Sequence, residues 1–189
     1  NIKCMCRLIC LMVFCFVGIG ISSSQSVCSP IYGVESLPGP QISIKGNYGF
    51  LWAHKQKMSN LINGHVSNFE IDYEYPIKKG FDWQEAFNYP KAGISFLYGG
   101  LGNSQELGLG TALYGFMRFP LIVNKRFMLS YKWGSGLGVI SKPFHYEKNY
   151  KNVAIGSTVN MFMHVSLQAK FLLSNRFSLS TGLGYSHYS

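Results

Sequence analysis

Three histidine–serine pairs in this chain have the spacing that a serine nucleophile and its base need within one strand: His65/Ser67, His164/Ser166 and His187/Ser189. Alternate residues of a strand point to the same face, so a histidine nitrogen can reach the serine hydroxyl two positions away. Such a serine attacks an acyl carbonyl when the histidine takes its proton and a third group orients the histidine. The chemistry that these pairs predict is hydrolysis through a serine nucleophile, and the strands that carry them decide which pair can perform it.

The strands are expected from a period of two in the hydropathy of seven segments: residues 41–54, 65–77, 89–100, 107–121, 126–141, 157–173 and 176–189. No convincing helical period occurs in this part of the chain. The segments are longer than the usual strands of soluble sheets, and each has one apolar face and one polar or glycine-rich face. This combination is typical of an all-β, antiparallel up-and-down outer-membrane β-barrel with lipid outside and a polar interior.

The composition supports strands rather than a helical enzyme. Of 189 residues, 13% are charged, 15% are aromatic and 21 are glycine. Aromatic residues pack well on pleated sheets, and glycine occurs where strands bend or approach closely. At this length a single domain is the expectation.

The alternation predicts which side chains face lipid. We expect these to point outwards: Leu129, Trp133, Met161, Val165, Leu167, Leu179 and Leu183. We expect Lys132, His164 and Gln168 to point into the barrel. In residues 107–121, Leu107 and Leu109 are expected on the outward face. A soluble, lipocalin-like barrel is the structural alternative, and it would bury Leu167 and expose His164.

The connections between strands predict the orientation of the barrel. "FPLIVNKRF" and "LLSNRF" are tight, whereas "AHKQKMSNLINGHV" and "SKPFHYEKNYKNVAIG" are long and polar. Short periplasmic turns and long external loops are the usual asymmetry of such barrels. "PIKKGFDWQEAFNYP" is longer than this scheme expects of a periplasmic turn.

This scheme separates the three histidine–serine pairs. His164 and Ser166 are on the polar face, where a hydrogen-bond network inside the barrel is expected. The pairs His65/Ser67 and His187/Ser189 are on the apolar face at the external end. A polar pair facing lipid is unfavourable unless its substrate is a lipid of the outer leaflet. The alternative is a plain polar strand end.

The number of strands is odd, whereas single-chain bacterial barrels close with an even number. An open barrel would leave unpaired backbone groups in lipid. We therefore expect eight strands in the full protein, seven of them present here, and a chain truncated at its carboxyl end.

The amino-terminal segment has the pattern of an export signal. Lys3 and Arg7 precede an apolar run from Leu8 to Ile21, which is followed by small polar residues. This order is typical of a secretory signal peptide, and the run is short for a transmembrane helix, although a signal anchor remains the alternative. The expected organisation is a signal peptide at 1–26, helical or detached from the barrel, a linker at 27–40, and a β-barrel domain at 41–189 whose last strand is missing.

The positions of the cysteines exclude a disulfide framework, and the net charge indicates the kind of binding partner. Four of the five cysteines fall within the expected signal peptide, which leaves only Cys28 after cleavage and excludes an internal disulfide. Lipidation of Cys28 is an alternative that its preceding residues do not favour.

The net charge of +9 favours an anionic partner. Outside the cytoplasm this partner is expected to be phosphorylated lipid at a membrane surface rather than nucleic acid.

Several stretches resemble a known family of outer-membrane hydrolases. The terminal "GLGYSHYS" and the "AIGS" before residues 157–173 look like the lipid A 3-O-deacylase family, also called the acyloxyacyl hydrolase-like outer-membrane family. The stretches "FDWQEAFNYPKAGISF" and "LGTALYGFMRFPL" look like its Bacteroidetes branch. The resemblance spans most of the chain after the signal peptide, and its catalytic motif is the final His-x-Ser.

The resemblance implies an eight-stranded barrel whose active site is on the outside, facing the membrane. By resemblance, Ser189 is the nucleophile and His187 is the general base. The family's acid lies in the next strand, and an Asn directly after the serine contributes to its oxyanion hole. Because both positions would follow Ser189, we expect this fragment to be inactive.

Two functions follow as hypotheses. The first is a bacterial outer-membrane serine esterase that removes an ester-linked acyl chain from lipid A in lipopolysaccharide, with no metal and no organic cofactor; a homodimer is left open. The second is a non-catalytic small barrel that acts as a structural protein, an adhesin or a narrow pore. An acidic residue in the strand after Ser189 would favour the enzyme.

Overall fold

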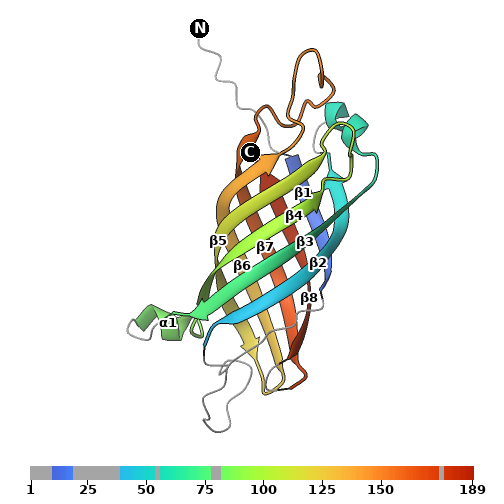
Figure 1. The fold of residues 1–189 in the computed structure, drawn as a ribbon. Helices are drawn as coiled ribbons and strands as arrows, with labels where there is room; N and C mark the ends of the chain where they lie inside the picture. The colour runs from blue at the N-terminus through green and yellow to red at the C-terminus, as the bar shows by residue number, and fades with distance from the viewer. Residues whose placement is uncertain (1–9, 19–38, 54–55, 78–81, 175–176) are drawn as a thin grey trace.

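The structure is a computed structural model that describes residues 10–18, 39–53, 56–77, 82–174 and 177–189. Eight antiparallel strands form a closed barrel in chain order, and β1 pairs with both β2 and β8 (Figure 1). The strands are β1 Cys10–Gly18, β2 Gln41–Trp52, β3 His65–Pro76, β4 Lys91–Gly100, β5 Leu109–Val123, β6 Phe127–Ile140, β7 Val159–Leu172 and β8 Ser178–Tyr188. The short helices are the 3-10 helix η2, Gln56–Leu61, and the α-helix α1, Asp82–Ala86. Among the described residues, no helix is long and apolar enough to cross a membrane.

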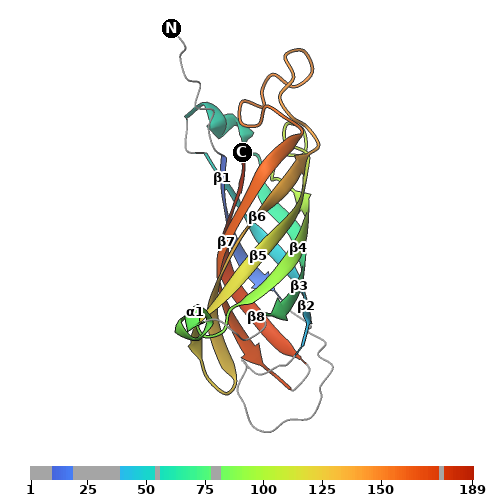
Figure 2. The same cartoon turned by 90° about the vertical axis from the view of Figure 1, so that its left-hand side faces the viewer.

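The all-β, antiparallel up-and-down barrel expected from the sequence is confirmed. The seven predicted strands correspond to β2–β8, and the strand boundaries differ from the prediction by at most two residues. Neighbouring strands are also neighbours in the chain, so hairpin connections alone build this part of the sheet. The turned view in Figure 2 shows the strong tilt of the strands around the barrel.

The expectation that the first two dozen residues are helical or detached is wrong for Cys10–Gly18. This segment is β1, the eighth strand of the barrel. Its sequence, CLMVFCFVG, contains valine and phenylalanine, which favour strands. Its pairing with β2 and β8 also satisfies backbone groups that would otherwise form two open edges. Residues 1–9 and 19–38 lie outside the described residues, and a signal peptide at 1–26 stays a prediction.

The predicted faces of the barrel wall are confirmed. Lys132 and His164 are fully buried and Gln168 is 4% exposed, all inside the barrel. The predicted outward residues are exposed, except for Leu129, which is half-buried on the same face. Leu167 is 44% exposed. The inside-out arrangement of a soluble lipocalin-like barrel is therefore excluded, because it would bury Leu167 and expose His164.

One predicted outward residue, Leu107, is instead buried. The strand begins only at Leu109, and Gly108 before it has a φ of 70°, a left-handed conformation that glycine adopts readily. The backbone N–H groups of Leu107 and Gly108 both donate to the carbonyl of Asn103, at 2.9 Å each. This turn breaks the alternation and directs the Leu107 side chain inwards.

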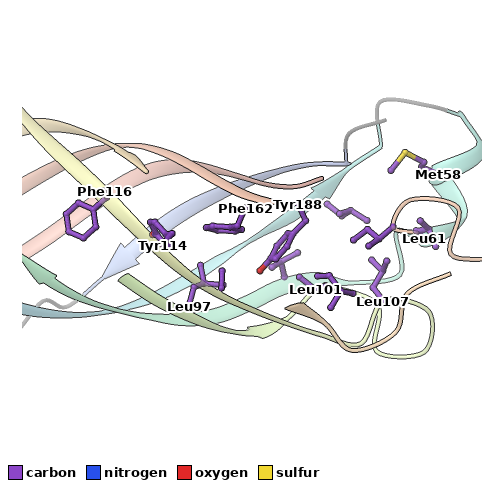
Figure 3. Close-up of a cluster of buried hydrophobic side chains, with 14 residues drawn as sticks. Met58, Leu61, Leu97, Leu101, Leu107, Tyr114, Phe116, Phe162 and Tyr188 are labelled. Atoms are coloured by element: carbon purple, nitrogen blue, oxygen red, sulfur yellow. The ribbon is translucent and has the colours of Figure 1, made fainter. Parts of the chain in front are cut away.

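An apolar cluster fills the barrel mouth at the end where the chain terminates (Figure 3). Met58 and Leu61 come from η2, Leu101 and Leu107 come from the β4–β5 connection, and their side chains are at most 3% exposed. They pack with aromatic side chains from the wall, which are Tyr114, Phe116, Phe162 and Tyr188. Hydrophobic burial thus closes this end of the barrel.

Strand β6 makes room for these aromatic rings with inward-facing glycines. A Cβ added at Gly136 would lie 2.2 Å from the carbonyl oxygen of Leu113 and 2.5 Å from Cα of Tyr114. A Cβ at Gly138 would lie 2.5 Å from the Tyr188 ring. The glycine-rich face seen in the sequence therefore leaves space for bulky aromatic side chains inside the barrel.

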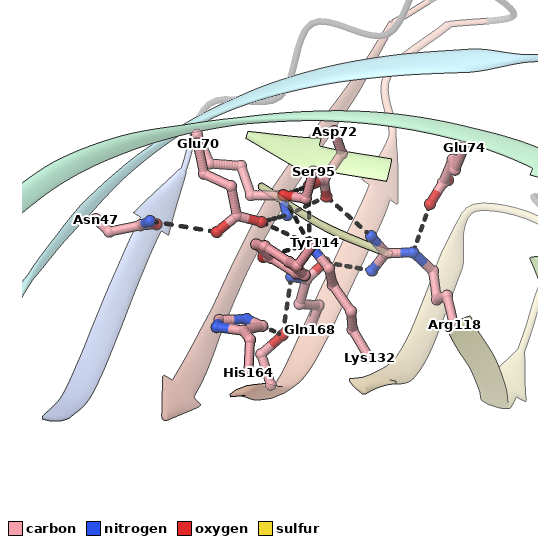
Figure 4. A network of polar contacts seen from close by, with 12 residues as sticks. Asn47, Glu70, Asp72, Glu74, Ser95, Tyr114, Arg118, Lys132, His164 and Gln168 are labelled. Carbon is pink, nitrogen blue, oxygen red and sulfur yellow. Dashed lines mark hydrogen bonds and ion pairs between the residues drawn. The ribbon is translucent and has the colours of Figure 1, made fainter. Parts of the chain in front are cut away.

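A network of charged side chains fills the lumen beside the apolar cluster, with Asp72 at its centre (Figure 4). Asp72 Oδ1 accepts hydrogen bonds from Ser95 Oγ at 2.6 Å and Lys132 Nζ at 2.8 Å. Asp72 Oδ2 accepts from Lys45 Nζ and, at 3.3 Å, from Arg118 Nη2. Each carboxylate oxygen therefore has two donors.

The flanking acids of β3 extend this network. Glu70 accepts from Lys132 Nζ at 2.6 Å, and Glu74 accepts from Arg118 Nε at 2.6 Å. The buried charged residues of the described part are Lys45, Lys91, Arg118, Lys132, Lys170, Glu70, Asp72 and Glu74. These five cations and three carboxylates leave two positive charges in excess. Because none of these side chains is more than 5% exposed, this part of the lumen is filled by side chains and does not resemble a water-filled channel.

Candidate active site

Ser189 lies directly after β8, where the ladder with β7 continues beyond the strand. Its backbone N–H donates to the carbonyl of Met161 at 2.9 Å, and the N–H of Met161 donates to the carbonyl of Ser189 at 2.8 Å. Residues paired in this way have their side chains on the same face of the sheet. Met161 is 53% exposed on the outer wall, and Ser189 is exposed as well. The candidate nucleophile is therefore on the outside of the barrel.

His187 is two residues before Ser189 on β8 and belongs to the same face of the strand. It pairs in register with Met163 of β7 on one side and with Leu11 of β1 on the other. Only 6% of His187 is exposed, whereas Leu183 on the same face is 58% exposed. The alternation alone predicts an exposed histidine, so this burial is a result of the tertiary structure. A packed imidazole beside an exposed serine suits a base whose orientation is restricted.

The surface beside Ser189 is apolar. Leu113 of β5, Leu137 of β6 and Met161 of β7 are in register with one another, and Met161 is in turn paired with Ser189. These three side chains are 59%, 65% and 53% exposed. They form a row across the outer wall that leads to the serine. A hydrocarbon chain lying against the barrel would meet this row next to Ser189.

Both residues lie at the end of the barrel that carries the connections 53–64, 101–108 and 141–158 (Figure 1). Residues 141–158 form the longest of these and are held by side-chain hydrogen bonds to the backbone. Asn149 Nδ2 and Asn152 Nδ2 donate to the carbonyl of Lys142 at 3.1 and 2.7 Å. Lys142 Nζ in turn donates to the carbonyl of Ser104 at 2.9 Å, which ties this connection to the one between β4 and β5. The site thus lies under a rim of interconnected loops.

The pair His164/Ser166 is inside the barrel, as predicted. Its His164 ring nitrogens lie 2.8 Å from Ser186 Oγ and 3.1 Å from Ser166 Oγ. All three residues are at most 2% exposed. They form a buried hydrogen-bond network that lipid substrates do not reach.

The pair His65/Ser67 is on the outer wall at the same end as His187 and Ser189. Both residues are exposed, and the His65 ring stacks on Tyr48 with centroids 4.9 Å apart. In the barrel this pair is separated from β8 by β1 and β2. The structure therefore places two histidine–serine pairs on the outer wall and does not bring them together.

Sequence reasoning missed the apolar row beside Ser189 and the pairing within the lumen. The row depends on the register of β5–β8, which the sequence does not contain. The acids of the lumen had a signal, since Glu70, Asp72 and Glu74 alternate on the polar face of one strand. Within the described ranges, no group of three or more His, Cys, Asp or Glu side chains is arranged to hold a metal ion.

Comparison with known proteins gives one family. The model of the family described as lipid A 3-O-deacylase (PagL) matches residues 67–189, which is more than half of the chain. The matched range runs from β3 to the end of the chain and includes His187 and Ser189. No curated protein and no solved structure gives a significant match.

Proposed function

Because the chain belongs to the lipid A 3-O-deacylase family, we propose that it is an outer-membrane serine esterase that removes an ester-linked acyl chain from lipid A. One observation carries the assignment of its site: Ser189 and His187 share the outer face of the wall, next to exposed apolar side chains. Lipid A is itself a lipid of the membrane around the barrel. An ester hydrolase with its nucleophile on the lipid-facing wall can therefore meet its substrate within the membrane.

In the proposed reaction, Ser189 Oγ attacks the ester carbonyl carbon while His187 takes the hydroxyl proton. The tetrahedral intermediate collapses, the bond to the sugar oxygen breaks, and His187 gives its proton to that oxygen. The acyl chain remains as an ester on Ser189. Water, deprotonated by His187, then releases the fatty acid and restores the serine. The two steps consume one water and require no electron transfer.

A carboxylate that orients His187 completes this mechanism. The acids of β3 face the lumen on the other side of the wall, and Asp82 and Glu85 belong to α1 at the opposite end of the barrel. Glu106 and Glu147 lie in the connections at the same end as His187, and Glu106 is paired with Lys151 at 3.6 Å. The family resemblance implies that an acid in a strand after the serine orients the histidine; such a strand could pair with β8 only in the place that β1 takes.

The apolar row provides a place for the scissile acyl chain. Leu113, Leu137 and Met161 would contact methylene groups on the side of Ser189 that is turned towards β5. Methionine adapts its shape easily, so Met161 can accommodate the chain beside the reacting carbonyl. The polar headgroup would then lie under the loop rim, where Lys142 and its neighbours are located.

The test is the mass spectrum of lipid A extracted from cells that express a full-length version of the protein, because the fragment that ends at Ser189 is expected to be inactive. Ser189→Ala is expected to abolish the loss of an acyl chain, with a fall in rate of at least about 10³-fold, because no other group takes over a nucleophile's role. His187→Ala is expected to have a similar effect. Deacylation at the wild-type rate in Ser189→Ala would refute the assignment and redirect it to Ser67.

The matched control is Ser166→Ala, because Ser166 has the same His-x-Ser spacing but faces the lumen. Its deacylation is expected to stay within about twofold of the wild type, in keeping with the small effects of changes away from a site. An equal loss in Ser189→Ala and Ser166→Ala would indicate a folding defect. Folding is followed separately by the shift in gel mobility between heated and unheated barrel.

The competing function is a non-catalytic barrel. A pore is disfavoured because the charged side chains that point into the lumen are at most 5% exposed and therefore fill it. A structural or adhesive role would be supported if the folded full-length protein released no acyl chain from lipid A.

A further inference from the structure

The connection between β3 and β4 has no role in the proposed reaction and is longer than the β5–β6 and β7–β8 connections at the same end of the barrel. The described part of this connection contains α1, Asp82–Ala86, and the turn that follows it. At the same end, β5 and β6 are joined by residues 124–126 alone. Closing a hairpin does not require a segment as long as the β3–β4 connection, so its length has another explanation.

The segment after α1 is held in a specific and unfavourable turn. Asn88 and Tyr89 both have positive φ angles, 54° and 53°. Asparagine tolerates this conformation, but tyrosine rarely adopts it. The N–H of Tyr89 donates to the carbonyl of Gln84 at 2.6 Å and that of Phe87 to the carbonyl of Trp83 at 3.2 Å, so the helix end and the turn form one hydrogen-bonded unit. The surrounding contacts must offset the cost of this turn.

Those contacts attach the unit to the outside of the barrel. The Phe87 ring meets the Phe119 ring of β5 edge-on, with centroids 5.8 Å apart. Phe119 stacks in turn on Tyr131 of β6 at 4.8 Å. Asn88 Nδ2 donates to the carbonyl of Pro120 at 3.3 Å. Phe119 and Tyr131 belong to the lipid-facing side of their strands, so α1 is fastened to the outer wall. Figures 1 and 2 show it beside the wall at the end remote from the carboxyl terminus.

The exposed side of this unit is aromatic. Trp83, Phe87 and Tyr89 are 40%, 50% and 45% exposed, and they continue the apolar wall of Phe119. Tryptophan and tyrosine gather where lipid headgroups meet hydrocarbon, because one part of each ring is apolar and the other donates a hydrogen bond. Asp82 and Glu85 on the same helix are exposed and charged, which favours the headgroup level over the hydrocarbon core.

We propose that α1 and its following turn, residues 82–89, form an interfacial anchor that binds the phospholipid leaflet at the end opposite His187 and Ser189. The occupant is phospholipid rather than a soluble protein, because the aromatic surface is continuous with the lipid-facing wall through Phe87 and Phe119. The anchor fixes the height and tilt of the barrel in the bilayer. It does not depend on the proposed catalysis.

The test uses the depth of Trp83 in reconstituted vesicles. The chain has three tryptophans, so the Trp52→Phe/Trp133→Phe protein reports on Trp83 alone. It is placed in phosphatidylcholine vesicles whose acyl chains are brominated near the headgroup or near the chain end. Fluorescence of Trp83 is expected to be quenched more strongly by the shallow bromine, with its emission shifted to shorter wavelength than that of a tryptophan in water.

Two further variants make the result decisive. The Trp52→Phe/Trp83→Phe protein retains Trp133, which is exposed on the outer wall in the middle of β6, and its quenching by the deeper bromine shows correct insertion. Adding Phe87→Ser to the Trp83 reporter is expected to weaken its lipid quenching. Trp83 that is quenched by aqueous acrylamide and by neither bromine would overturn the anchor. Shielding from acrylamide without lipid quenching would also overturn it, because something other than lipid would then cover the surface.

Discussion

The lumen network allows a sharp prediction about the replacement Asp72→Asn. Asparagine has the shape of aspartate, but it exchanges one acceptor oxygen for an NH₂ group and removes the charge. In the structure each oxygen of Asp72 faces two donors: Ser95 and Lys132 on one side, Lys45 and Arg118 on the other. Whichever way the amide is turned, its NH₂ group therefore faces a cation.

The size of the effect follows from these contacts. The variant loses at least one charge-assisted hydrogen bond outright, worth about 1.5–3 kcal/mol, and the other bonds weaken because the acceptor is neutral. It also raises the excess of positive charge in the lumen from two to three. Breaking a buried ionic contact by removing one partner costs about 3–5 kcal/mol. We expect a loss of that size in the free energy of unfolding.

Lys132→Met is expected to cost less, about 1–3 kcal/mol as for other changes of buried polar contacts. It leaves both Glu70 and Asp72 bound to Lys45 and lowers the positive excess. In the double variant the NH₂ group of the introduced asparagine can face Ser95, whose hydroxyl accepts, while the amide oxygen serves Lys45 and Arg118. The two costs are therefore expected to be less than additive, by about 1–3 kcal/mol.

The assay is urea unfolding in detergent micelles, followed by tryptophan fluorescence. Asp82→Asn in the exposed helix α1 is the matched control, expected within about 0.5 kcal/mol of the wild type. If Asp72→Asn were as stable as this control, the lumen would be hydrated and its charges screened. Strict additivity in the double variant would show that Asp72 and Lys132 do not share the network.

Other predictions concern the wall. Gly136→Ala is expected to lower the free energy of unfolding by about 1–3 kcal/mol, because its Cβ would lie 2.2 Å from the carbonyl oxygen of Leu113. Gly46→Ala is expected to leave the free energy of unfolding unchanged, because its Cβ would meet nothing within 4 Å. Equal effects of the two variants in urea unfolding would argue against the close approach at Gly136. Leu167→Arg is expected to cost about 2–4 kcal/mol in lipid, because residue 167 lies midway along the outer wall. Leu173→Arg, just beyond the end of β7, should cost no more than about 1 kcal/mol when both variants are unfolded by urea from phospholipid vesicles. Tolerance of arginine at residue 167 would show that this face is not in hydrocarbon.

The hydropathy pattern of the sequence determined the strands of residues 41–189 and the face of nearly every side chain in them. It could do so because the side chains of a strand alternate strictly, so one apolar residue sets the direction of its neighbours. The same rule places His187 and Ser189 together on the lipid-facing side. It failed at Leu107, where the positive φ of Gly108 interrupts the alternation before the strand begins.

Which residues are neighbours in space was decided only by the tertiary structure. Asp72 and Lys132 are 60 residues apart in the chain, and they meet because the barrel closes around a shared lumen. Ser189 faces Met161 through the register between β7 and the end of β8, and β1 lies between β2 and β8 because both strands offer unpaired edges. Periodicity specifies a direction out of a sheet but carries no information on lateral register, which depends on the turns and on the packing of all strands together.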